Sequence, residues 1–144
     1  MRPECLEHPM GLVGDPALDG KTVILLMHYA MRDREGGPYD VYYECLANVN
    51  AVEAVLGGHG DRISAILHGH VHRGYRTELR TSRGSVPILN PGCSGLSWDP
   101  GRRRAAHFSL IDLGNGGLAV ERYAYNGESK RFEREPRAAF SSGW

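Results

Sequence analysis

The chain has 144 residues, a length typical of one domain, and its 41% of hydrophobic residues is enough to build one core. Its 17 Lys and Arg residues balance 17 Asp and Glu residues, so net charge gives no argument for nucleic acid or an anionic membrane as a partner. The three cysteines form no Cys-x-x-Cys motif, no apolar run approaches the ~20 residues needed to cross a bilayer, and no signal peptide is visible, which together predict a cytoplasmic protein.

The first half of the chain predicts a strand, a helix and a second strand. Val23–Met27 is an unbroken apolar run, which is typical of a strand buried on both faces. Between Tyr43 and Leu56 the apolar residues recur at intervals of four, three and four, which predicts one helical face, with Gly57-Gly58 as a C-cap. Ile63–Leu67 is the second buried run. A helix between two buried strands predicts a parallel βαβ unit.

The rest of the chain has a different pattern. Residues 1–20 are rich in Pro, Gly and acidic residues and predict an irregular lead-in, while the polar tail, residues 129–144, is expected to be frayed. Short strand-like runs separated by turn signals predict an antiparallel sheet of hairpins. These runs are residues 75–79, 86–89, 107–113 and 118–125. The fold class predicted for the whole chain, taken as a single domain, is α/β.

Histidines follow both predicted parallel strands. His28 ends the first strand, and His68, Gly69, His70 and His72 follow the second. Because the carboxyl ends of parallel strands meet at one edge of a sheet, two distant segments are expected to converge there. Glycine permits a tight bend on leaving the strand, and the two following histidines would lie two apart on an extended loop. Neutral imidazole is a common ligand of Zn, Fe and Mn, so the pattern predicts a metal locality.

Other histidines have simpler explanations. A single histidine after a strand is usually a polar loop residue, and His8, His59 and His107 are interpreted in this way. If the second strand continues through His68, its side chain would hydrogen-bond a backbone carbonyl or support the metal ligands rather than bind metal itself.

Three segments together resemble the calcineurin-like metallophosphoesterase family. VILLMHYA is similar to the family strand that ends in a metal-binding histidine, and AILHGHVHRG is similar to its Gly-His-x-His motif. ILNPGCSG is similar to its Asn-Pro-Gly-Ser stretch, with Cys93 in place of serine. The order of the segments and the trailing hairpins also agree, and the resemblance covers Thr22 to Tyr125.

The resemblance implies part of an αββα sandwich and the hydrolysis of small phosphate mono- or diesters with two divalent metal ions, Mn, Fe or Zn. Carried over by motif, His28 and His70 would bind the second metal and His72 the first. The residues expected to support these ligands or to lie near substrate are His68, Arg73 and Asn90.

The chain also departs from the family pattern, because the Asp-x-His and Gly-Asn-His motifs that supply most ligands do not occur. Gly14–Asp19 only approximates Gly-Asp-x-x-Asp, with its second aspartate one residue late. No catalytic residue is identified, and three histidines alone would hold at most one metal weakly. We therefore expect the C-terminal part of a longer enzyme, with an exposed sheet edge that invites self-association or a complementing chain.

Two alternatives remain at this stage. The chain could be a non-catalytic remnant that acts as a binding or regulatory module, or a mononuclear metal-binding protein built on the histidine cluster. Metal affinity separates them, because a metal sensor needs a closed set of three or four ligands.

Overall fold

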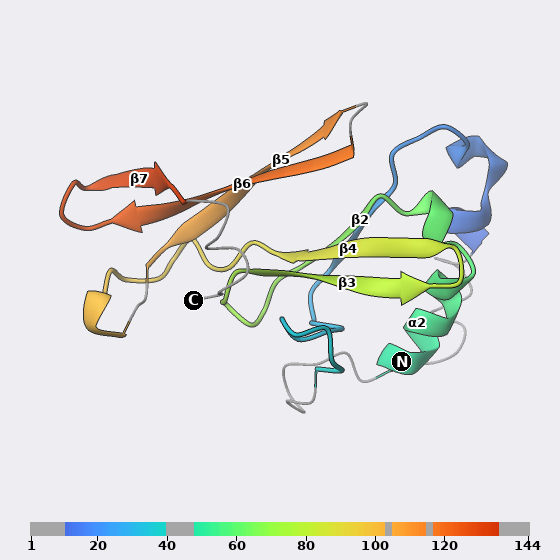
Figure 1. The fold of residues 1–144 in the computed structure, drawn as a ribbon, viewed down its shortest axis with the longest axis horizontal. Helices are drawn as coiled ribbons and strands as arrows, with labels where there is room; N and C mark the ends of the chain where they lie inside the picture. The colour runs from blue at the N-terminus through green and yellow to red at the C-terminus, as the bar shows by residue number, and fades with distance from the viewer. Residues whose placement is uncertain (1–10, 40–47, 103–104, 115–116, 136–144) are drawn as a thin grey trace.

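The computed structural model describes residues 11–39, 48–102, 105–114 and 117–135, which form two sheets and a helix (Figure 1). The four-stranded sheet has the order β1 (Ile24–Met27), β2 (Ala65–His68), β4 (Gly84–Asn90) and β3 (Tyr75–Thr81). The three-stranded sheet has the order β5 (His107–Gly114), β6 (Gly117–Asn126) and β7 (Arg131–Arg134). Helix α2 covers Val49–Gly57, and short 3-10 turns cover Pro16–Leu18, Gly60–Arg62 and Pro100–Arg102.

The predicted α/β class and its βαβ unit are confirmed. β1 and β2 are parallel, α2 lies between them in the chain, and Met27 stands opposite His68 at the carboxyl ends. The helix buries Val52 and Leu56 against the sheet. The side chains of the first sheet alternate between its faces, and one face carries the core. The fully or largely buried core residues are Val13, Met31, Val52, Leu56, Ile63, Ile66, Leu79, Val86 and Ile88.

Three details differ from the sequence predictions. β1 is an edge strand of the described sheet and Leu26 is 78% exposed, so burial on both faces was wrong for this strand. β4 does not belong to a separate antiparallel sheet, because it pairs in parallel with β2 as well as antiparallel with β3. Gly58 does cap α2, but with a right-handed φ of −75° rather than a left-handed one.

The two ends of the chain are more regular than predicted where they are described. Residues 11–14 are helical and Pro16–Leu18 form a 3-10 turn, so this part of the lead-in is not irregular. At the other end, Arg131–Arg134 pair with β6 as strand β7, which contradicts a frayed tail up to this point. Residues 136–144 and the predicted start of the helix at Tyr43 lie outside the described residues.

A buried ion pair fastens the second sheet to the turn that follows β2. Arg122 of β6 is 1% exposed, its Nε lies 2.9 Å from Glu135 Oε2, and its Nη1 donates to the Gly74 carbonyl at 3.3 Å. Burial lowers the pKa of Arg122, and the Glu135 carboxylate opposes this shift. A Cβ at Gly74 would lie 2.8 Å from the guanidinium carbon, so glycine makes this close approach possible.

A second close contact joins the start of β5 to the loop after β4. His107 is 4% exposed rather than a polar loop residue, its Nδ1 donates to the Ala105 carbonyl at 2.9 Å, and its buried Nε2 has no hydrogen-bond partner among the described residues. Its ring lies against Gly92, which has φ +87°. Burial lowers the pKa of His107, with a smaller lowering from Arg122.

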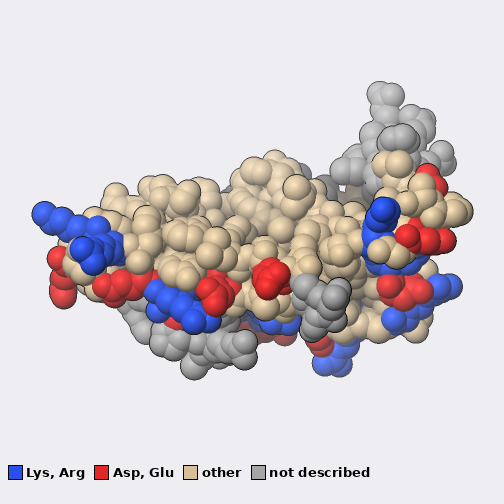
Figure 2. Space-filling view, turned by 90° about the horizontal axis from the view of Figure 1, so that it is seen from above, with Lys and Arg blue, Asp and Glu red and all other residues tan. Residues whose placement is uncertain are grey.

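The distribution of charge on one face of the molecule agrees with the equal numbers of acidic and basic residues in the sequence. On the face shown in Figure 2, acidic and basic side chains lie beside one another, and no extended area of one sign is seen on that face. Among the described residues, no helix is both long and apolar enough to span a membrane.

The close contact between Gly92 and His107 predicts that one methyl group added at Gly92 strongly destabilises the protein. In Gly92→Ala, the new Cβ would meet the His107 ring at 1.5 Å and φ +87° would strain the backbone. In the control Gly84→Ala, φ is +124° but nothing lies within 4 Å of the new Cβ. We expect about 1–2 kcal/mol of destabilisation in the control from strain alone and about 1–3 kcal/mol more in Gly92→Ala from overpacking, measured by urea unfolding. Equal losses would contradict the close contact.

The lowered pKa of His107 predicts acid sensitivity. Its folded pKa lies below the ordinary value of 6.5, so the unfolded chain binds the proton first as the pH falls. Stability is therefore fully present above about pH 6.5 and decreases below it, by at most about 1.4 kcal/mol per pH unit for one proton. Replacing His107→Gln should make the free energy of unfolding depend less steeply on pH between 6.5 and 5. An unchanged slope in urea titrations would contradict the assignment.

Candidate metal centre at the ends of β1 and β2

His28 and His70 meet at the shared edge of β1 and β2. Nε2 of His28 lies 2.9 Å from Nδ1 of His70, and the two ring centroids are 4.7 Å apart. The Tyr29 ring packs edge-on against both imidazoles with centroid distances of 4.8 Å. The parallel register brings the two strand ends together, and the Gly69 N–H donates to the His28 carbonyl at 3.3 Å. Two segments that are 42 residues apart therefore present facing nitrogens.

The backbone of the Gly-His-x-His segment is strained. His70 has φ +69° and His72 has φ +54°, values that side-chain-bearing residues adopt rarely, so the predicted extended loop was wrong. The Val71 N–H donates to the Gly69 carbonyl at 2.9 Å, which closes a γ-turn with His70 at its centre. Such strain in a well-defined turn is typical of functional sites, where the surrounding structure holds it in place.

The structure does not bring every predicted residue to this point. His72 and Arg73 are both exposed, whereas the described side-chain contacts of His28 are with His70 and Tyr29. The role of His72 as a metal ligand therefore stays a prediction, and so does the position of Arg73 near the substrate. Of the three predicted ligands, the described contacts bring His28 and His70 together.

His68 and Asn90 lie under the turn, on the core face of the sheet. His68 is 2% exposed and Asn90 is 3% exposed. Nε2 of His68 is 3.1 Å from the Tyr75 hydroxyl, and Nδ2 of Asn90 is 3.4 Å from His68 Nδ1 and 3.2 Å from the Gly69 carbonyl. Burial lowers the pKa of His68, and burial raises the pKa of Tyr75 far above its ordinary range.

Sequence reasoning missed Tyr75 and Arg32 as parts of this locality. The Tyr75 hydroxyl donates to the Arg32 carbonyl at 2.7 Å, and the Arg32 guanidinium pairs with Glu53 of α2 at 2.5 Å. No signal along the chain pointed to Tyr75, because its position depends on its cross-strand pairing with Asn90.

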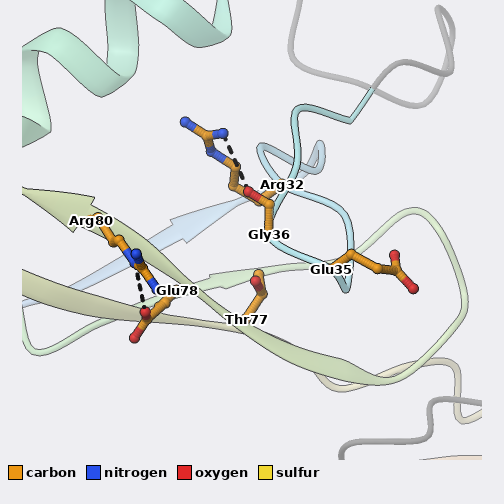
Figure 3. A pocket seen from close by; sticks show the side chains of 6 residues that line it. All are labelled: Arg32, Glu35, Gly36, Thr77, Glu78 and Arg80. Carbon is orange, nitrogen blue, oxygen red and sulfur yellow. Dashed lines mark hydrogen bonds and ion pairs between the residues drawn. The ribbon is translucent and has the colours of Figure 1, made fainter.

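A pocket of about 330 Å³ lies between the loop after β1 and strand β3 (Figure 3). Its lining residues are Arg32, Glu35, Gly36, Thr77, Glu78 and Arg80. Within it Arg32 donates to the Gly36 carbonyl and Arg80 to Glu78 (Figure 3). None of the described histidines lines this pocket, so it is a separate feature from the histidine pair.

The geometry of the histidine pair fits two ligands of one metal ion. Two nitrogens bound to one ion at about 2.0–2.1 Å each lie roughly 2.9–3.4 Å apart, depending on the angle at the metal. The His28 to His70 distance of 2.9 Å falls in this range. Within the described residues, however, no group of three His, Cys, Asp or Glu side chains could hold a metal, so the donor set is partial.

Comparisons with known proteins find distant structural similarity and no match by sequence. No protein-family model and no curated protein matches this chain. A Vps29 single mutant from Entamoeba histolytica is similar with a TM-score of 0.37 and 18% identity, over 67% of this chain and 50% of that protein. A putative 5'-nucleotidase from Staphylococcus aureus, in complex with alpha-ketoglutarate, is similar with a TM-score of 0.34 and 17% identity, over 92% of this chain and 20% of that protein.

The chain therefore spans half or less of the length of these two structures. Both matches are distant, and each covers only part of the protein it matches.

Because His72 has a positive φ, we expect its replacement by glycine to stabilise the folded protein. In His72→Gly, relief of a left-handed cost of about 1–2 kcal/mol should outweigh the entropy of about 0.5–1 kcal/mol that glycine adds to the unfolded chain. Lys130→Gly is a matched control, because Lys130 has φ +55° in a turn of the second sheet. Both variants should raise the free energy of unfolding by a similar amount in urea titrations. Destabilisation by His72→Gly alone would show that its side chain makes a stabilising contact.

Proposed function

We propose that this chain carries the histidine part of a dinuclear-metal site that hydrolyses phosphate mono- or diesters. The observation that carries the proposal is the approach of His28 Nε2 to His70 Nδ1 at 2.9 Å, with His70 held in a strained γ-turn.

In this proposal His28 and His70 bind one metal ion and His72 binds the other. Each histidine must be neutral, with a lone pair on the nitrogen that faces the ion. The His28 and His70 nitrogens already face each other, so a divalent ion such as Mn, Fe or Zn would replace the proton that the two rings share. Bound metal ions would supply Lewis-acid stabilisation of the phosphoryl oxygens.

The proposal also needs ligands from elsewhere. Hard divalent ions prefer carboxylates, and the described residues place none beside the histidine pair. We infer that a further segment or a complementing chain supplies them. The open edge of β1 supports this inference, because its backbone is unpaired on one side within the described sheet and Leu26 is 78% exposed there.

A second candidate function follows from the same partial donor set. A two-histidine site with an open sheet edge also suits a non-catalytic module that binds a partner, or a protein that binds a single metal ion with help from that partner. In either case, His28 and His70 would bind metal without hydrolysis. The measurements below separate binding from catalysis.

Metal titration of the chain tests the histidine pair directly. We expect weak binding of one Co²⁺ or Zn²⁺ ion by calorimetry, with loss of binding in His28→Ala and in His70→Ala because each removes one of two facing nitrogens. His59→Ala is the matched control, since His59 lies beyond α2 and away from the pair. If His70→Ala bound metal as tightly as the unchanged chain, the proposed site would be wrong.

Catalysis requires a separate assay, in which a nitrophenyl phosphodiester is hydrolysed by the protein together with whatever segment completes the site. Metal-dependent turnover that His70→Ala abolishes, and that His59→Ala leaves intact, would support the phosphoesterase. Metal binding without turnover in the completed protein would instead favour the non-catalytic module.

A further inference from the structure

Three polar side chains continue the buried row of the core at the carboxyl edge of the first sheet. His68 of β2, Asn90 of β4 and Tyr75 of β3 come from neighbouring strands, and all three are at most 5% exposed. On the same face, Ile66 and Ile88 precede His68 and Asn90 by two residues in their strands. Polar atoms at these buried places cost free energy unless they are hydrogen-bonded, so the bonds that they make are informative.

Counting protons shows which form of His68 this cluster requires. The single Tyr75 hydroxyl proton is given to the Arg32 carbonyl at 2.7 Å, so the hydroxyl oxygen can only accept from His68 Nε2 at 3.1 Å. We therefore assign the His68 proton to Nε2. Its Nδ1 is then an acceptor, and Nδ2 of Asn90 donates to it at 3.4 Å.

The other proton of the same amide reaches the strained turn. Asn90 Nδ2 also donates to the Gly69 carbonyl at 3.2 Å, the acceptor that closes the γ-turn around His70. Oδ1 of Asn90 accepts from the Gly92 N–H at 2.8 Å, which fixes which end of the amide faces the histidine. A continuous chain of hydrogen bonds therefore runs from the Arg32 carbonyl to the carbonyl beside His70.

We propose that Tyr75, through His68 and Asn90, is a positioning residue that holds the His70 turn in its strained form and so keeps Nδ1 of His70 facing His28. The alternative form of His68, with its proton on Nδ1, would itself donate to the Gly69 carbonyl, which lies 3.3 Å away. Nδ2 of Asn90 would then have no acceptor on His68. It would also compete with Nδ1 of His68 for the Gly69 carbonyl. The inference rests on the proposed metal-binding role of the histidine pair, although its structural part is testable without metal.

Tyr75→Phe removes one hydroxyl and keeps the ring that packs on His68. In the metal-free protein we expect three changes by NMR. The ¹⁵N shifts of His68 should show a proton on Nδ1, the Val71 amide should exchange with solvent at least tenfold faster, and the contact between the His28 and His70 rings should weaken. Affinity for Co²⁺ should fall about tenfold or more, the usual cost of losing a group that orients a ligand.

Val86→Ala is the control for general destabilisation, because Val86 is fully buried on β4 at the far end from the turn. It should lower stability and leave the His68 proton, Val71 exchange and Co²⁺ affinity unchanged. His68→Gln should restore much of what His68→Leu loses, because an amide can donate to Tyr75 and accept from Asn90. The positioning role would be overturned if Tyr75→Phe left the His68 proton and Val71 exchange as they were.

The two proposals fail in different ways. If the unchanged chain bound no Co²⁺, the metal site would be wrong, and the NMR measurements would still decide whether Tyr75 holds the turn. If the unchanged chain bound Co²⁺ and Tyr75→Phe bound it equally well, the metal site would stand and the positioning role would be overturned.

Discussion

The parallel register between β1 and β2 is the constraint on which the histidine pair depends. It aligns Met27 with His68, so that both strands leave the sheet at one edge and the Gly69 N–H reaches the His28 carbonyl. A slip of one residue would move every side chain of a strand to the other face. The buried face would then lose Ile66 and His68 together, and neither the core nor the support under the turn would survive.

The turn between β2 and β3 is held from both sides. On one side, buried polar groups of the first sheet bond to the Gly69 carbonyl, and on the other, Arg122 of the second sheet bonds to the Gly74 carbonyl. Buried polar groups stabilise a structure when they are paired, and each of these two carbonyls accepts a hydrogen bond from a buried side chain. A turn held in this way can keep the unfavourable φ angles of His70 and His72.

Local patterns predicted the elements that neighbouring residues determine. The βαβ unit, the position of His28 at a strand end and the hairpins around residues 107–125 were expected from apolar runs and turn signals, and the structure has them. The membership of β4 in the first sheet was not expected, because the turn before it is a local signal and its parallel pairing with β2 is not. His107 was misjudged for the same reason, since its burial depends on Gly92.

The sequence by itself determined which chemistry is present: two strand-end segments rich in imidazole, in an order that predicts their meeting at one edge. Only the tertiary structure decided which imidazoles meet, because spacing along a chain does not set φ angles or side-chain directions. It placed His28 against His70, left His72 in solvent, and put Tyr75 beneath the turn. The reason is that hydrogen bonds between strands far apart in the chain, rather than local preference, hold the backbone of this turn.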